Sequence, residues 1–336
     1  MRILVGSYHF SPDIGGIETA SALLATEFAG KGHDVRLVTE TARLDAEPWP
    51  FAVIRRPSPA RLLKELWWCD LFYQNNISLQ TLWAAFLVSK PWVVTHQTWI
   101  SGVDGTMGWQ DPLKRLLLHF GSNVAVSQAI AEKIPVPSVI VGNPYRADLF
   151  KPLSGRPRDR ELVFLGRLVS DKGLDLLIEA LGGLRREGLA PRLTVIGNGP
   201  EEAAMRNLAT ARGVAEQIDF AGQRTGPELA ELLNAHQIMV APSRWPEPFG
   251  IVALEGIGCG CVVVGSEGGG LREAIGTCGL TFPNGSVEGL KDALRRLLLE
   301  PALVERLRLN RTSHLERFEV GAIAQKYLEL FEEVTQ

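Results

Sequence analysis

Short apolar segments alternate with longer amphipathic segments along most of the chain. We expect the apolar segments to be β-strands and the amphipathic ones helices, and this alternation predicts parallel sheets covered by helices on both faces. Expected strands span 2–6, 35–39, 52–54, 71–73, 92–95 and 123–126, then 161–166, 192–197, 218–221, 238–241, 262–265 and 280–282. The sequence therefore predicts an α/β protein with two doubly wound, Rossmann-like sheets.

The alternation restarts after residues 151–157, which are rich in proline, glycine and arginine, as linkers often are. We expect an N-terminal domain at 1–150, a C-terminal domain at 151–315 and a final helical segment at 316–336. Two such sheets would form an interdomain cleft at the carboxyl ends of their strands, where open α/β sheets bind ligands.

Composition narrows the function. The 336 residues carry a net charge of −3, which gives no electrostatic reason to expect nucleic-acid binding. The cysteines are scattered, which indicates a reducing cytosol. No histidine pair has metal-ligand spacing and no Asp-x-Asp follows a strand, so we expect no metal. The N-terminus predicts a strand, and no apolar run is long enough to span a bilayer, so we expect a cytoplasmic protein.

The most informative segment runs from Glu247 to Glu255. A helix begins within it, and helix N-terminal amides and the helix dipole suit a diphosphate, while Gly250 lets a ligand come close. Along a helix, Gly250 and Glu255 lie about 7.5 Å apart, roughly a diphosphate-to-ribose step. We expect Glu247 to hold the transferred sugar, the amides of Phe249, Gly250 and Ile251 to bind phosphate, and Glu255 to bind the ribose diol. A helix cap followed by a solvated glutamate is the simpler alternative.

The region 243–273 resembles the donor-site signature of glycosyltransferase family 4, the retaining enzymes of GT-B fold. The matching features are Pro242-Ser243, the Glu-Pro-Phe-Gly at 247–250, Glu255, Cys259-Gly260 and the glycine run from Gly268 to Glu273. Gly256-Ile257-Gly258 departs from the alanine-rich helix that is more usual in the family. Each glycine costs a helix roughly 1 kcal/mol, so a looser helix end is expected.

Other candidates follow the ends of expected strands. Arg167 and Lys172 could neutralise a diphosphate, and the resemblance implies that they stabilise the departing nucleoside diphosphate; surface solvation is the alternative. Gly15 and Gly16 begin a helix, and the resemblance implies that they face the donor phosphate across the cleft. A tight turn is the alternative there. This loop lacks the Gly-x-Gly-x-x-Gly spacing of a nicotinamide dehydrogenase.

The resemblance also suggests roles for three isolated residues. It places His96, which ends an expected strand, beside the donor sugar, although a lone histidine is more often structural. Asn198 lies in a Gly-x-Gly-Pro turn that is similar to the family's nucleotide-side turn, and Arg224 is a weaker candidate for a residue near the base.

These features predict a metal-independent retaining glycosyltransferase that needs no cofactor beyond its nucleoside-diphosphate-sugar co-substrate. A front-face reaction, in which a donor phosphate oxygen takes the acceptor proton, is implied by the resemblance. The alternatives are a GT-B nucleotide-sugar epimerase or hydrolase, which would need an acidic pair across the cleft, and a non-catalytic sugar-nucleotide binding subunit. By resemblance the final helix returns to the first domain; the sequence alone equally allows an ordinary terminal helix of the second.

The acceptor and the donor base are left open, and a glycan, a lipid-linked molecule or a small molecule could accept the sugar. Asn75-Asn76, Trp99 and the loop 101–109 are acceptor-facing candidates. The segment 55–68 mixes cations with aromatics and could touch an anionic membrane surface, as a peripheral protein at the inner membrane face would. A helix packed through leucine and tryptophan with a solvated basic face is the favoured interpretation.

Overall fold

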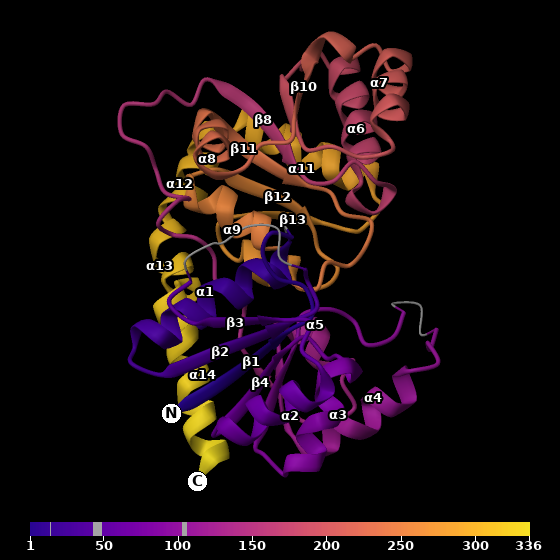
Figure 1. Cartoon of the computed structure of the whole chain (residues 1–336). Helices are drawn as coiled ribbons and strands as arrows, with labels where there is room; N and C mark the ends of the chain where they lie inside the picture. The colour runs from indigo at the N-terminus through magenta and orange to yellow at the C-terminus, as the bar shows by residue number, and fades with distance from the viewer. Residues whose placement is uncertain (14, 43–48, 103–105) are drawn as a thin grey trace. The chain divides into compact units, whose positions relative to one another are not determined.

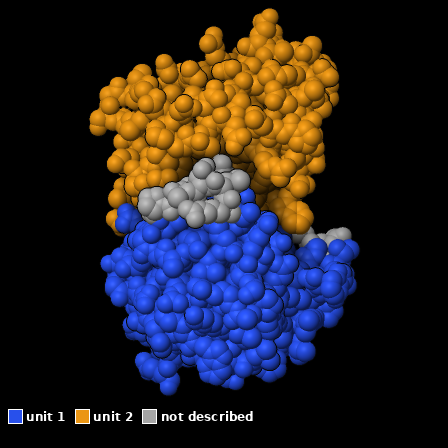
Figure 2. All heavy atoms as spheres, viewed as in Figure 1, with its two compact units in different colours: residues 1–144, 318–336 blue, residues 145–317 orange. Residues whose placement is uncertain are grey.

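The chain folds into two compact units, each built on one parallel sheet (Figure 1). The computed structural model describes residues 1–13, 15–42, 49–102 and 106–336. Unit 1 comprises residues 1–144 and 318–336, and unit 2 comprises residues 145–317 (Figure 2). The prediction of two doubly wound α/β sheets is confirmed, and all twelve expected strands occur.

Unit 1 contains a seven-stranded sheet in the order β3-β2-β1-β4-β5-β6-β7. Its strands are β1 (Arg2–Ser7), β2 (Asp34–Thr39), β3 (Ala52–Arg55), β4 (Leu71–Asn75), β5 (Trp92–His96), β6 (Ser122–Ala125) and β7 (Val139–Ile140). The sequence did not predict β7, because it is a two-residue edge strand whose side chains are both exposed and so lack a burial pattern.

The helices of unit 1 include the last helix of the chain. They are α1 (Gly16–Gly30), α2 (Pro59–Trp68), α3 (Leu79–Val88), α4 (Asp111–Leu117), the 3₁₀ turn η1 (Leu118–Phe120), α5 (Gln128–Ala131) and α14 (Val320–Thr335). Helix α14 packs on α1 and brings Tyr327 and Phe331 against Phe28 and Tyr73. The Tyr327 hydroxyl also lies 2.8 Å from Thr95 Oγ1. The C-terminal residues thus complete the core of unit 1.

Unit 2 contains a six-stranded sheet in the order β10-β9-β8-β11-β12-β13. Its strands are β8 (Arg160–Leu165), β9 (Leu193–Ile196), β10 (Ile218–Gly222), β11 (His236–Ala241), β12 (Val262–Ser266) and β13 (Gly279–Phe282). Residues 151–157, expected to form a linker, belong to this unit: Asn234 accepts a hydrogen bond from Leu153 N (2.9 Å) and donates one to Lys151 O (3.0 Å).

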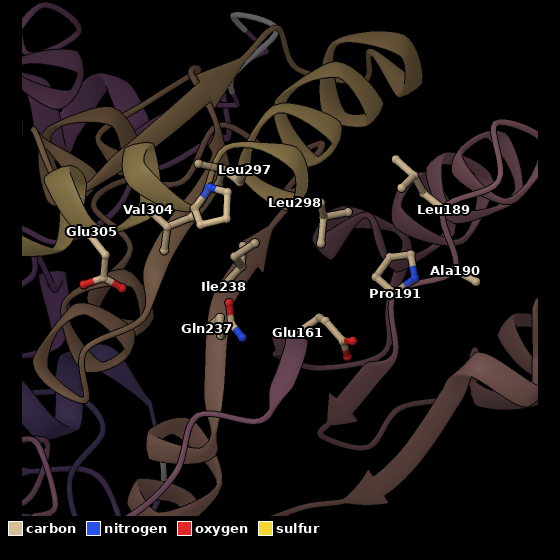
Figure 3. Close-up of a pocket in the computed structure, with 11 residues that line it drawn as sticks. Glu161, Leu189, Ala190, Pro191, Gln237, Ile238, Leu297, Leu298, Val304 and Glu305 are labelled. Atoms are coloured by element: carbon tan, nitrogen blue, oxygen red, sulfur yellow. The ribbon is translucent and has the colours of Figure 1, made fainter.

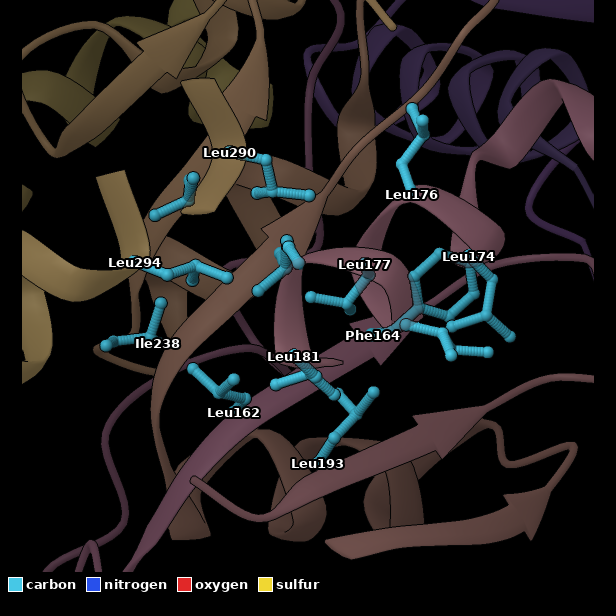
Figure 4. Close-up of a cluster of buried hydrophobic side chains, with 14 of the residues drawn as sticks. Leu162, Phe164, Leu174, Leu176, Leu177, Leu181, Leu193, Ile238, Leu290 and Leu294 are labelled. Carbon is cyan, nitrogen blue, oxygen red and sulfur yellow. The ribbon is translucent and has the colours of Figure 1, made fainter. Parts of the chain in front are cut away.

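Helices on the unit 2 sheet enclose a continuous apolar core. They are α6 (Leu174–Arg186), α7 (Glu202–Ala211), α8 (Gly226–Ala235), α9 (Ile251–Gly258), α10 (Leu271–Ile275), α11 (Val287–Leu299), α12 (Pro301–Leu309) and α13 (Arg311–Leu315). The 3₁₀ turns are η2 (Ser170–Lys172), η3 (Ala215–Gln217) and η4 (Glu316–Phe318). The last residue of η4, Phe318, is the first residue of the C-terminal segment that belongs to unit 1. Leu177 and Leu181 of α6 pack with Leu162 of β8 and Leu294 of α11 (Figure 4). This core holds the strand ends that carry the candidate site.

The two glycines of α9 serve close packing. The helix continues regularly to Gly258, so the loose end expected from Gly256 and Gly258 is not observed. A Cβ atom on Gly256 would lie 2.5 Å from the Met239 sulfur, and one on Gly258 would lie 2.5 Å from Phe150 O. Tertiary contact therefore overrides the low helix propensity of glycine.

We expect Leu177→Ala to lower the free energy of unfolding by about 2–5 kcal/mol, because Leu177 is fully buried and the smaller side chain would leave a cavity. Thermal and urea unfolding would measure the loss. The control is Leu299→Ala, which alters a leucine that is 60% exposed and should change stability little. Equal effects of the two substitutions would contradict the packing described.

Candidate functional site

The predicted site residues of unit 2 gather at one edge of its sheet. The strand order reverses between β8 and β11, and ligands of open α/β sheets bind at the carboxyl ends of strands at such a switch point. The residues that follow successive strand ends there are Arg224 after β10, Asn198 after β9, Arg167 and Lys172 after β8, and Glu247 after β11.

An ion pair spans the switch point. Lys172 Nζ lies 2.6 Å from Glu247 Oε1, and Ser243 Oγ donates a hydrogen bond to the same oxygen at 2.8 Å. The Glu247 side chain is only 16% exposed, whereas that of Lys172 is 35% exposed. One carboxylate oxygen is thus held by two donors, and neither of these donors uses Oε2.

Backbone contacts bring the two loops of this ion pair together. Asp171 O accepts hydrogen bonds from the amides of Arg244 (2.8 Å) and Trp245 (3.2 Å), and the Arg244 side chain pairs with Asp175. Gly173 has φ +69°, and a Cβ atom there would lie 2.0 Å from Pro242 O. Only glycine therefore allows the lysine loop to approach this closely.

The glycine run after β12 is anchored to the same loop. Gly270 N donates to Glu247 O at 2.7 Å, and Gly269 pairs with Glu247 as an isolated parallel bridge. Asn284, which follows β13, accepts from Gly268 N at 2.6 Å and donates to Ser243 O at 3.2 Å. Sequence reasoning missed Asn284, because no motif marks it and its role depends on the pairing of β12 with β13.

Helix α9 begins beside this ion pair. Gly250 precedes it with φ +98°, a conformation that favours glycine, and a Cβ atom there would lie 2.6 Å from Leu271 Cδ1. Phe249 is buried, and Ile251 is partly exposed. The first amides of α9 therefore follow closely after Glu247 in the chain.

Glu255 lies inside α9 in a densely packed surround. A small part of its surface stays exposed, but burial dominates and raises the pKa of its carboxyl to about 8, with Arg146 opposing this in part. No side chain or amide in the described part of the chain hydrogen bonds this carboxyl. Glu255 is thus a largely shielded carboxyl with no hydrogen-bond partner in the described part of the chain.

The remaining cations and Asn198 are exposed at the same edge. The Arg167 guanidinium pairs with no acidic group among the residues that the structure describes, whereas Arg224 lies 3.9 Å from Glu228. Asn198 O accepts from Leu168 N at 3.0 Å, and Gly222 lies close to both Asn198 and Arg224. The structure therefore brings the turns after β8, β9 and β10 together.

In unit 1, Gly15 and Gly16 lie at the start of α1, as predicted. A carboxylate already occupies this helix end, because the Glu18 side chain packs so closely on Gly15 that a Cβ atom there would lie 2.4 Å from Glu18 Oε2. Gly15 is extended, with φ −176°, so the close approach rather than its conformation calls for glycine. A phosphate at this end would have to displace Glu18.

His96 is fully buried at the end of β5. Its Nε2 lies 3.0 Å from Asn123 Oδ1, and the Asn123 amide group donates to the carbonyls of Leu118 and Gly121. These contacts make Asn123 Oδ1 an acceptor, so Nε2 carries the proton and Nδ1 is an acceptor with no partner in the described chain. Burial lowers the pKa of His96 to about 4, so the ring is neutral at neutral pH.

A buried amide network fixes the neighbouring strand ends. Gln97 donates to Asn75 Oδ1 (2.9 Å) and Asn143 Oδ1 (2.8 Å), and Asn143 donates back to Gln97 at 2.7 Å. Asn75 also donates to Ile17 O at 3.1 Å. Asn75, which ends β4 and is fully buried, therefore holds the start of α1 in place, although the sequence suggested that it faces an acceptor.

Other acceptor-facing candidates are more accessible. Asn76 and Trp99 are partly exposed, and Asn76 Oδ1 accepts from Gln97 N at 3.3 Å. In the candidate loop 101–109, residues 103–105 lie outside the described residues, and Trp109 is 88% exposed.

A separate pocket of about 370 Å³ lies at the other edge of the unit 2 sheet (Figure 3). Glu161, Gln237 and Ile238, near the starts of β8 and β11, line it together with Leu298 and Val304. None of the predicted site residues contributes to it. The pocket lies at the amino ends of these strands, whereas the candidate site lies at their carboxyl ends.

The described chain offers neither a metal-binding cluster nor a helix that could span a membrane. Residues 1–13, 15–42, 49–102 and 106–336 contain no group of three or more histidine, cysteine, aspartate or glutamate side chains placed to hold a metal ion. None of the described helices combines the length and apolar character that crossing a bilayer requires.

Known proteins resemble the chain in sequence and in fold. A glycogen synthase of Mycobacterium tuberculosis is 28% identical over 91% of this chain and 88% of its own length. A D-inositol 3-phosphate glycosyltransferase of Actinosynnema mirum is 35% identical over 52% of this chain and 44% of its own length. The structure of Anabaena Alr3699/HepE in complex with UDP matches with a TM-score of 0.82 at 19% identity, covering 99% of this chain and 100% of that one.

A sucrose-phosphate synthase from Thermosynechococcus elongatus gives a TM-score of 0.80 at 20% identity, covering 99% and 98% of the two chains. These likenesses, with the two parallel sheets, establish the GT-B fold. The family model described as glycosyl transferases group 1 matches residues 146–314, which span the unit 2 site from Arg167 to Glu255. The chain therefore belongs to the glycosyl transferases group 1 family.

Proposed function

We propose that this glycosyltransferase is a retaining enzyme of the family 4 type that transfers a sugar from a nucleoside-diphosphate sugar to an acceptor hydroxyl. The observation that carries the proposal is the arrangement around Glu247. Lys172 and Ser243 both donate to Oε1. Neither donates to Oε2, which can therefore accept hydrogen bonds from sugar hydroxyls. A carboxylate oriented in this way positions a donor sugar without acting as its nucleophile.

Charge at the same edge would stabilise the leaving group. Arg167 has no acidic partner in the described chain, and a Cβ atom on the preceding Gly166 would lie 3.7 Å from the Lys172 side chain. The N-terminus of α9, the positive end of its dipole, follows the turn that carries Glu247. These groups can neutralise a nucleoside diphosphate, so we propose that the reaction needs no metal. Glu255, deeper in α9, would accept hydrogen bonds from the ribose diol.

The reaction would follow a front-face course. As the sugar becomes oxocarbenium-like, its bond to the diphosphate oxygen breaks, the acceptor oxygen bonds to the same carbon from the same face, and a phosphate oxygen takes the acceptor proton. No protein nucleophile is needed. His96 is neutral, and its buried Nδ1 is an acceptor without a partner in the described chain, which suits a hydrogen bond from a sugar hydroxyl better than a role as general acid.

The base of the donor is best approached through the structural relatives. Anabaena Alr3699/HepE has been crystallised with UDP and with UDP-glucose. We therefore propose UDP as the first nucleotide to test, with GDP and ADP as alternatives.

Thermal unfolding with UDP, GDP, ADP or NAD, in the presence of a chelator, tests the donor site. We expect one diphosphate to raise the melting temperature of the wild type, and Glu255→Ala to remove most of that rise. Glu247→Gln should keep the rise with the diphosphate and lose the extra rise given by the matching nucleotide sugar. Glu288→Ala, at a carboxylate that is 76% exposed on α11, is the control. A response to NAD alone, or to none of the diphosphates, would contradict the proposal.

The raised pKa of Glu255 gives a second test. Between the ordinary carboxyl pKa of 4.5 and the raised pKa of about 8, the folded protein binds more protons than the unfolded chain, so the stability contributed by this group falls as pH rises. Glu255→Gln should therefore gain stability relative to wild type as pH rises from about 5 to about 9. Ribose hydroxyls favour the carboxylate, so nucleotide affinity of the wild type should increase with pH up to about 8.

Parallel thermal-unfolding and calorimetric titrations at each pH would measure both effects. Glu288→Gln is the matched control, because it makes the same change on an exposed side chain. Nucleotide affinity of Glu255→Gln should be weaker and nearly independent of pH. An unchanged pH profile in this variant would show that another group controls binding.

A further inference from the structure

Helix α3 in unit 1 exposes apolar side chains on its solvent face. Trp83, Phe86 and Leu87 are 38%, 37% and 66% exposed, while Leu82 and Ala85 on the other face are buried. A helix that is apolar all round is usually enclosed on every side. The outer face of α3 therefore lacks the polar cover expected of a surface helix.

The neighbouring helix α4 and the turn η1 continue this surface. Leu113, Leu116 and Phe120 are 49%, 57% and 63% exposed, and their spacing places them on one side of the helical segment. The rings of Phe86 and Phe120 lie 5.8 Å apart, which joins the two helices. Figure 1 shows α2, α3 and α4 along one side of unit 1. We call the exposed side chains of Trp83, Phe86, Leu87, Leu113, Leu116 and Phe120 the apolar face.

The charges beside the apolar face are mostly positive. Cations lie on α2, after α3 and on α4, namely Arg61, Lys64, Lys90, Lys114 and Arg115. The acidic groups of the same segments are withdrawn: Glu65 is fully buried between Arg36 and Arg61, and Asp111 is nearly buried beside Lys114. Arg61 and Lys64 are exposed and Lys90, Lys114 and Arg115 are partly exposed, so these segments carry more accessible cations than anions in a chain whose net charge is −3.

We propose that the apolar face of unit 1 binds the surface of an anionic lipid bilayer. Aromatic and leucine side chains would enter the interfacial layer, while lysine and arginine would meet lipid phosphates. The side chains stand on the outer faces of helices with cations beside them, which suits an anionic lipid surface better than capture of a peptide. The proposal does not depend on the donor or on the reaction.

The structure also changes the role suggested for segment 55–68. Its helix α2 buries Leu62 and Leu66 in unit 1, so the favoured interpretation of a packed helix agrees with the contacts. Arg61 and Lys64 lie on its exposed side and Trp67 is 67% exposed. Helix α2 would therefore supply charge at the margin, and α3 and α4 would supply the inserting side chains.

Vesicle co-sedimentation of the full chain tests the proposal. The probes are vesicles of phosphatidylcholine alone and of phosphatidylcholine mixed with phosphatidylglycerol, at low and high salt. We expect binding to the anionic vesicles, weakened by salt, and a loss of at least about tenfold in the partition coefficient for Leu113→Asp/Leu116→Asp, because each inserted leucine would be replaced by a charge.

The matched control is Leu299→Asp/Leu309→Asp in unit 2. It makes the same change in residue type and net charge at leucines that are 60% and 83% exposed, and it should leave vesicle binding unchanged. Unaltered melting temperatures would show that both double variants remain folded. If Leu113→Asp/Leu116→Asp is unfolded, Lys64→Gln/Lys90→Gln provides the test instead. This variant should weaken binding to the anionic vesicles and leave the result with phosphatidylcholine vesicles unchanged.

Three results would overturn the proposal. The first is failure of the wild type to bind anionic vesicles, and the second is equal loss in the two leucine-to-aspartate variants. The third is concentration-dependent self-association without vesicles that Leu113→Asp/Leu116→Asp abolishes, which would make a second copy of the chain the occupant of this face.

Discussion

The ion pair between Lys172 and Glu247 links two loops that lie 75 residues apart in the chain. It forms because β8 and β11 are neighbours in the unit 2 sheet, so the loops that follow them leave the same edge. Gly173 lets those loops approach, and Asn284 joins them to the glycine run after β12. The candidate donor site therefore depends on strand order more than on any one motif.

Two carboxylates of this site differ in their surroundings, and the difference suits different tasks. Glu247 accepts hydrogen bonds from a lysine and a hydroxyl, at a partly exposed position. Glu255 lies where burial raises its pKa and Arg146 offsets this only in part. Burying a carboxyl without a hydrogen-bond partner costs stability, and this cost is consistent with the proposed role in binding the ribose diol.

Unit 1 contains a network of buried amide side chains at its strand ends. Gln97, Asn143 and Asn75 hydrogen bond one another and the start of α1, so the strand ends of this unit form a fixed base. Next to this network, the buried Nδ1 of His96 has no hydrogen-bond partner in the described chain. Trp83, Phe86 and Leu87 of α3, Leu113 and Leu116 of α4 and Phe120 of η1 are among the apolar side chains of this unit that remain exposed.

The sequence by itself determined the two parallel α/β sheets, because strand burial and helix amphipathicity are local patterns that repeat with fixed periods. It also marked Glu247, Gly250 and Glu255, because a helix start between the two glutamates can be predicted from local sequence. It could not reveal the Glu18 carboxylate against Gly15 or the clamp made by Asn284, since these contacts join side chains through close tertiary approach. The glycines of α9 illustrate the same limit: propensity predicted a loose end, and packing against Met239 and Phe150 decided otherwise.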